Sequence, residues 1–67
     1  MNLEMLLNTV PEDTVIELAT EDTHYTFYWG EAKHAFVRPE RKTWRHYPVR
    51  FVRPHNNELY IEVDTYI

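Results

Sequence analysis

The sequence predicts a small α+β protein in which a short N-terminal helix packs on a four-stranded, mainly antiparallel sheet built from two hairpins. Three observations support this fold class. Apolar residues near the start recur at helical spacing, and four later segments alternate in polarity as strands do. The connections are too short for parallel crossovers, except between the two hairpins. With 67 residues the chain has room for one domain, residues 1–67, and one small core.

The first ten residues predict a helix. Its apolar face has the i, i+3, i+4, i+7 spacing and consists of Leu3, Leu6, Leu7 and Val10. Asn2 is a suitable N-cap for this helix. Pro11 ends it, because a residue that precedes proline is driven out of the α region. We expect the helix to cover one side of the sheet.

Residues 14–20 and 24–29 predict the first hairpin, with a polar turn at residues 21–22. In the first strand Ile16 and Leu18 share one face and Glu17 lies on the other. Strict alternation in the second strand places Tyr25, Phe27 and Trp29 together, opposite His24, Thr26 and Tyr28. Gly30 is expected to end this strand.

The middle of the chain leaves alternatives open. Residues 31–36 either continue the strand or form a connecting turn, and residues 39–45 predict a short helical turn with Pro39 at its first position. Alternation returns over residues 47–53, a short strand bracketed by Pro48 and Pro54. Residues 55–57 predict a turn, because Asn tolerates left-handed geometry. Residues 59–66 are the clearest strand.

Alternation also sorts the ten aromatic residues. It predicts a core of Phe27, Trp29, Phe51, Ile16, Leu18, Leu59, Ile61 and Val63. It places Tyr28, Tyr60 and Tyr66 on the opposite face. An exposed, tyrosine-rich sheet face is typical of an interface with another protein or with a second copy. Because so small a chain is marginally stable alone, a homodimer is expected slightly ahead of a monomer.

Three segments of the chain resemble a known class of proteins. The opening "MNLEMLLNTVPEDTVIEL", the hairpin end "YWGEA" and the closing "NNELYIEV" are similar to small accessory proteins of phages and prophages. The resemblance implies a phage or prophage origin and a non-enzymatic role in binding and modulating a host or defence component. An anti-CRISPR-type inhibitor is one example of that class. The central residues are more basic and aromatic than this pattern.

Charge is partitioned along the chain. Residues 1–32 carry seven acidic side chains and no basic one, for a net charge of −7. Residues 33–55 carry all seven Lys and Arg against one Glu, for a net charge of +6, and residues 56–67 have a net charge of −3. An asymmetry of this kind concerns the protein's partners more than its fold.

The basic segment, residues 33–55, has two competing interpretations. As a contact surface it combines cations with aromatic rings, and the residues predicted to bind are Arg38, Arg41, Lys42, Trp44, Arg45 and Arg50. A protein partner is favoured, and nucleic acid is the alternative because the same residues suit phosphates and bases. In the second interpretation, acidic side chains such as Glu17, Glu62 and Asp64 neutralise Arg50 and its neighbours across the sheet.

Residue types needed for common catalytic and metal sites are missing. The chain has no Cys, no Ser and one Gly, which excludes the usual thiol and serine nucleophiles and a glycine-rich phosphate loop. The four His stand at positions 24, 34, 46 and 55, too far apart in sequence for a zinc motif. We therefore expect no enzyme activity, no cofactor and no metal.

The N-terminal composition predicts a cytoplasmic protein. Residues 1–32 contain no Lys or Arg, so the basic region of a signal peptide is missing. No stretch approaches the apolar length that a bilayer requires. We expect no membrane association, and the host cell cytoplasm as the location if a phage encodes the chain.

Overall fold

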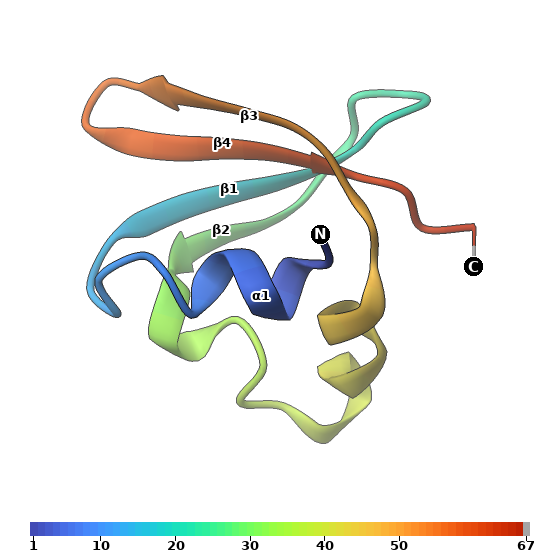
Figure 1. The fold of residues 1–67 in the computed structure, drawn as a ribbon, viewed down its shortest axis with the longest axis horizontal. Helices are drawn as coiled ribbons and strands as arrows, with labels where there is room; N and C mark the ends of the chain where they lie inside the picture. Colours follow the sequence, from blue (N-terminus) through green and yellow to red (C-terminus); the bar gives the residue numbers. More distant parts are fainter. Residues whose placement is uncertain (67) are drawn as a thin grey trace.

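The structure, a computed structural model, describes residues 1–66 and has the α+β fold that the sequence predicts (Figure 1). Its elements in chain order are the helix α1 (Leu3–Leu7), the strands β1 (Val15–Thr20) and β2 (Thr26–Glu31), the 3-10 helices η1 (Ala32–His34) and η2 (Pro39–His46), and the strands β3 (Val49–His55) and β4 (Glu58–Val63).

The four strands form one mixed sheet in the order β2-β1-β4-β3. β1 and β2 make one antiparallel hairpin, and β3 and β4 make the other. The two hairpins meet where β1 runs parallel to β4, with Ile16 opposite Leu59 and Leu18 opposite Ile61. The segment between the hairpins, which contains η1 and η2, supplies the long connection that a parallel pair needs.

The N-terminal helix is shorter than the sequence predicts but begins as expected. The Asn2 side chain accepts a hydrogen bond from the Met5 backbone N–H at 2.9 Å, which satisfies one of the free donors of the first turn. The helix ends at Leu7 rather than continuing to residue 10. Its start is tied to the segment before β3, because the Leu3 N–H donates to the Tyr47 carbonyl at 2.9 Å.

The core lies on one side of the sheet, which we call the inner face. It contains residues from α1, β1, β4 and the η1 region, namely Leu3, Ile16, Leu18, Ala32, Ala35, Ile61 and Val63. Figure 1 shows α1 and both 3-10 helices gathered on the same side of the sheet. The expected helical turn at residues 39–45 forms as η2, and residues 31–36 continue the strand to Glu31 before turning into η1.

A bulge in β2 overturns the expected alternation of the second strand. Leu18 faces Tyr28, but the next residue of β1, Ala19, faces Thr26, so Phe27 is an extra residue in β2. As a result, both Phe27 and Tyr28 pack against the core. The prediction that Tyr28 lies on the opposite face is therefore wrong, and so is the prediction that Trp29 lies in the core, because Trp29 is 67% exposed.

A second bulge has the same effect in β3. Val49 pairs with Val63, but Phe51 pairs with Glu62, so Arg50 is the extra residue. Phe51 therefore shares a face with Glu62 instead of with the core residue Val63, and it is 45% exposed. The prediction that Phe51 belongs to the core is wrong for this reason. The last strand also ends at Val63, before residues 64–66 of the predicted strand.

The β3–β4 turn forms where the sequence predicts it. Asn56 and Asn57 have φ angles of 51° and 64°, the left-handed geometry that Asn tolerates and that a two-residue hairpin loop needs. His24, in the β1–β2 turn, also has a positive φ of 58°. Within residues 1–66, no helix has the length and apolar character required to cross a bilayer.

Candidate functional site

The second face of the sheet, which we call the outer face, is built from two rows of side chains that cross all four strands. Strand register places one residue of each strand in a first row of Trp29, Glu17, Tyr60 and Arg53. A second row consists of Thr26, Ala19, Glu62 and Phe51. Glu58 and His55 form the next pair toward the β3–β4 turn. Directly opposed side chains in such rows are in contact distance of one another.

Aromatic rings are exposed at both edges of this face. Trp29, on the edge strand β2, is 67% exposed, and Phe51, on the edge strand β3, is 45% exposed. Tyr60 lies between them and is half-buried, with its ring 6.4 Å from that of Phe51. Single exposed aromatic residues are common on protein surfaces, whereas several on one face with polar neighbours are typical of an interaction surface.

Two carboxylates of the outer face are held by neighbouring side chains. The Thr26 hydroxyl donates to Glu17 Oε2 at 2.6 Å. The Trp29 indole N–H donates to Glu58 Oε1 at 3.0 Å, across β1 from one strand of the sheet to another. These bonds fix both the carboxylates and the orientation of the Trp29 ring.

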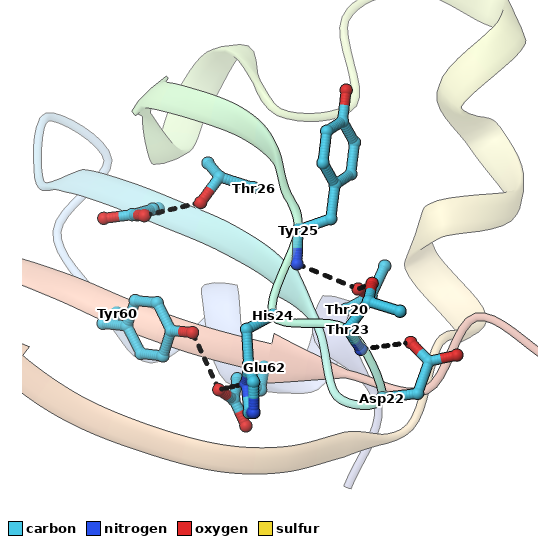
Figure 2. A network of polar contacts seen from close by, with 9 residues as sticks. Thr20, Asp22, Thr23, His24, Tyr25, Thr26, Tyr60 and Glu62 are labelled. Carbon is cyan, nitrogen blue, oxygen red and sulfur yellow. Dashed lines mark hydrogen bonds and ion pairs between the residues drawn. The ribbon is translucent and has the colours of Figure 1, made fainter.

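The third carboxylate, Glu62, is the centre of a three-residue network (Figure 2). The Tyr60 hydroxyl lies 2.7 Å from Glu62 Oε2 and donates to it, and His24 Nδ1 lies 2.7 Å from the same oxygen. Figure 2 shows His24 reaching this carboxylate from the β1–β2 turn, in which His24 itself has a positive φ.

The network changes the titration of two of its members. Burial raises the pKa of the Tyr60 hydroxyl to about 12, and the hydrogen bond to Glu62 adds to this effect. The hydrogen bond from Tyr60 lowers the pKa of the Glu62 carboxyl, against the opposing effect of burial, and His24 lowers it further. Glu62 is therefore a stable anion in the middle of the outer face.

One arginine completes the outer face. The Arg53 guanidinium lies 5.2 Å from the centre of the Tyr60 ring and 6.0 Å from that of Phe51, a cation–π arrangement. Three carboxylates (Glu17, Glu58, Glu62) stand against this single permanent cation. The outer face is thus aromatic and acidic, with its side chains held in place by one another.

Two cavities lie apart from the network of His24, Tyr60 and Glu62. His24, Tyr60 and Glu62 meet at the open surface and line neither of these cavities. One, of about 240 Å³, is lined by Glu21, Asp22, Val63, Asp64, Thr65 and Tyr66. The other, of about 270 Å³, is lined by Leu7, Asn8, Glu12, Ala32, Lys33 and Phe36. Within the described residues, no three His, Asp or Glu side chains are grouped to hold a metal ion.

The residues that the sequence predicts to bind lie apart from the outer face, and most of them contact the protein itself. Five of them (Arg38, Arg41, Lys42, Trp44, Arg45) fall on η2 or its N-cap, and Arg50 lies in the β3 bulge. Arg45 Nη1 is 2.7 Å from a carboxylate oxygen of Glu4, and Arg50 Nη2 is 3.2 Å from one of Asp64.

The other predicted basic residues make weaker contacts within the protein or none that the structure describes. Arg38 lies 4.0 Å from Glu40 and remains exposed. Arg41 stacks its guanidinium on two rings, 5.1 Å from the centre of Tyr28 and 5.0 Å from that of Trp44. Lys42 is exposed. The predicted pairing of Arg50 with Asp64 is present, whereas Glu17 and Glu62 bind Thr26, Tyr60 and His24 instead.

Trp44 has a role in packing. Its ring meets Phe27 edge-on at 5.0 Å and Tyr28 at 6.0 Å, and the residue is half-buried against the core. The exposed tryptophan of the molecule is Trp29. Its exposure depends on the β2 bulge. The sequence signal for this bulge is Gly30, which directly follows the aromatic residues Phe27, Tyr28 and Trp29. A side chain at Gly30 would place its Cβ 2.9 Å from the Tyr28 hydroxyl, so glycine makes room for the Tyr28 ring.

Comparison with known proteins shows no relative of this chain, since no protein-family model matches the sequence and neither a curated protein nor a solved structure is similar to it.

Proposed function

We propose that this chain is a small, non-catalytic binding module that engages a protein partner through its outer face and acts by occluding the partner's surface. The observation that carries the proposal is the exposure of Trp29 and Phe51 on a sheet face where neighbouring side chains hold one another in place. Tryptophan, tyrosine and arginine are the residues most enriched among energetic hot spots, and the outer face contains all three.

Preorganisation supports binding by this face. Ordering a side chain on association costs about 0.5–1.5 kcal/mol. On the outer face that cost is already met for Glu17, Glu58 and Glu62, because each accepts a hydrogen bond from a neighbour within the protein. A partner therefore meets a surface whose shape and charge are set before contact.

The basic segment is less well suited to be the main contact. Four of its seven cations (Lys33, Arg38, Arg45, Arg50) lie within 4.0 Å of a carboxylate of the same chain, and Arg41 is stacked on two rings. This arrangement supports internal neutralisation as the reason for the charge partition. A nucleic-acid-binding function would depend on the exposed cations Arg38 and Lys42 at η2 and on Arg53, which is exposed in β3.

The resemblance to phage and prophage accessory proteins directs the choice of partner. A host or defence component in the cytoplasm is the first class of protein to search, and inhibition by occlusion is the expected effect. A structural homodimer is the alternative for the same face. Sedimentation equilibrium at micromolar concentration tests this alternative directly, because a dimer has twice the monomer mass.

The test is comparative capture from cell lysate on immobilised chains. Wild type is compared with Trp29→Ala and Phe51→Ala on the outer face and with Val37→Ala as a matched control, since Val37 is 65% exposed between η1 and η2. A true partner is retained by wild type and by the control and is lost from the two outer-face variants. With the purified partner, loss of Trp29 is expected to weaken binding about thirtyfold, as for a hot-spot residue.

A further pair of variants separates the two candidate surfaces. Arg38→Ala and Lys42→Ala remove the two exposed cations on η2 and its N-cap, and neither residue lies on the outer face. If these variants lose the partner while Trp29→Ala keeps it, the contact surface is the basic segment and the proposal for the outer face is wrong.

A further inference from the structure

We infer that the partner presents an arginine side chain, which stacks on the exposed Trp29 ring and directs its guanidinium toward Glu58 and Glu17. This inference rests on the proposed function of the outer face and adds the chemistry of its ligand. It follows from three features of that face, which are the free ring, the neighbouring carboxylates and the overall sign of the charge.

The free ring is the first feature. The outer face already binds one guanidinium, since Arg53 lies over Tyr60 and Phe51. Within residues 1–66, cation–π contacts also occupy Tyr28, Phe36 and Trp44, whereas Trp29 has none. Trp29 is 67% exposed, and tryptophan is the best cation–π acceptor among the side chains.

The carboxylates beside Trp29 are the second feature. Glu17 is directly opposite Trp29 in the β1–β2 register, and Glu58 accepts the indole hydrogen bond through Oε1. The Thr26 hydroxyl already donates a hydrogen bond to Oε2 of Glu17. Each carboxylate thus retains a second oxygen, and a guanidinium has planar donors that reach an aromatic face and a carboxylate at the same time. Lysine lacks this planar fork, so arginine suits the site better.

The sign of the charge is the third feature. It favours an arginine-bearing protein over a nucleic acid or a second copy of this chain as the ligand. With three carboxylates and one arginine, the outer face repels a phosphate backbone. A two-fold dimer through this face would bring two acidic surfaces together, which costs binding energy. A positively charged protein segment gains from the same field during both encounter and docking.

The experiment is an NMR titration of the ¹⁵N-labelled 67-residue chain with capped peptides. The probes are tetra-arginine, tetra-lysine, tetra-glutamate and an uncharged peptide that contains one tryptophan. The two indole N–H signals provide an internal comparison, because Trp29 is exposed and Trp44 packs against Phe27 and Tyr28. We expect tetra-arginine to move the Trp29 indole signal and the backbone amides of Glu17 and Gly30, with little change at Trp44.

Three variants distinguish binding at this site from general attraction to an acidic protein. Trp29→Ala removes the ring, and Glu58→Gln removes one carboxylate beside it. Glu12→Gln makes the same charge change at an exposed position before β1. The affinity for tetra-arginine is expected to fall about fivefold in Trp29→Ala, in line with an exposed cation–π contact, and to fall more in Glu58→Gln than in Glu12→Gln.

The outcomes distinguish this inference from the proposed function. If tetra-arginine and tetra-lysine move signals evenly over all acidic residues and Trp29→Ala has no effect, the arginine site is refuted. If the uncharged or acidic peptide moves the Trp29 signals instead, the outer face binds protein but its ligand is not arginine. If no peptide moves them, the arginine inference fails, and the capture experiment decides the proposed function by itself.

Discussion

At the scale of single residues, the two tryptophans show how position decides the role of a side chain. Trp44 is half-buried and meets Phe27 edge-on at 5.0 Å, so its indole stabilises the fold. Trp29 is 67% exposed, and its indole N–H donates a hydrogen bond to Glu58. The same residue type therefore supplies core packing at one position and an exposed ring on the outer face at the other.

This difference predicts opposite consequences for the two alanine variants. Trp44→Ala is expected to lower the free energy of unfolding by about 2 kcal/mol, because it leaves a cavity beside Phe27 and Tyr28. Trp29→Ala is expected to change it by less than about 0.5 kcal/mol, as for most surface substitutions. Urea unfolding followed by circular dichroism measures both. An unchanged midpoint for Trp44→Ala would show that this ring does not support the core.

Tyr60 predicts a dependence of stability on alkaline pH. Its pKa is about 12 in the folded protein, above the ordinary tyrosine value of 10.0, so the native state holds this proton more tightly than the unfolded chain. The resulting stabilisation is complete below pH 10 and is lost as the pH rises toward 12. Urea unfolding of wild type and Tyr60→Phe at several pH values measures it. The stability difference between the two proteins is expected to shrink above pH 10, and a constant difference would contradict the assignment.

At the scale of elements, the bulges in β2 and β3 determine which side chains form the outer face. Each inserts one residue, Phe27 in β2 and Arg50 in β3, and so reverses the alternation on one side of the bulge. The exposed edge of β3 is at the same time protected against pairing with another chain. Pro54 lacks the N–H that an incoming strand would bind, and Arg50 and Arg53 add charge. These features disfavour pairing at the β3 edge, which agrees with our proposal that a partner binds the outer face.

The β3–β4 turn gives a prediction at the same scale. Asn57 has a φ of 64°, which is unfavourable for residues with a side chain and free of steric cost for glycine. Asn57→Ala is expected to lower the free energy of unfolding by about 1 kcal/mol, and Asn57→Gly to leave it equal or slightly higher. Thermal unfolding of the three proteins checks the order. An alanine variant as stable as the glycine variant would show that this turn geometry is wrong.

At the scale of the whole molecule, the charge partition of the sequence becomes a set of internal contacts. The N-terminal helix and η2 are joined by the pair of Glu4 with Arg45, and β3 is joined to the segment after β4 by Arg50 with Asp64. Exposed pairs of this kind contribute roughly 0–1 kcal/mol each. Their main consequence concerns the electrostatic field around the protein, because four of the seven Lys and Arg of residues 33–55 lie within 4.0 Å of a carboxylate.

This arrangement predicts weak binding to nucleic acids. Labelled single- and double-stranded DNA and RNA, titrated with the protein at low and near-physiological salt, are expected to show no micromolar binding by fluorescence anisotropy. Binding through phosphates would be recognised by a steep loss of affinity with salt. If such binding appears and Arg38→Ala or Lys42→Ala abolishes it, the basic segment is a nucleic-acid-binding surface and the alternative function becomes the leading one.

The sequence by itself determined the type and order of most elements of this protein, but it left residues 31–36 open and extended the helix and the last strand beyond Leu7 and Val63. Three patterns each extend over only a few residues. They are the helical spacing that begins at Leu3, the strand alternation of Ile16 and Leu18, and the turn at Asn56 and Asn57. Local patterns are therefore sufficient to predict the α+β fold. Only the tertiary structure decided which rings face the solvent. A bulge changes little in the composition of a strand, yet it moves every following side chain to the other face. The partners that set the register, such as Glu17 for Trp29 and Glu62 for Phe51, lie on other strands of the sheet.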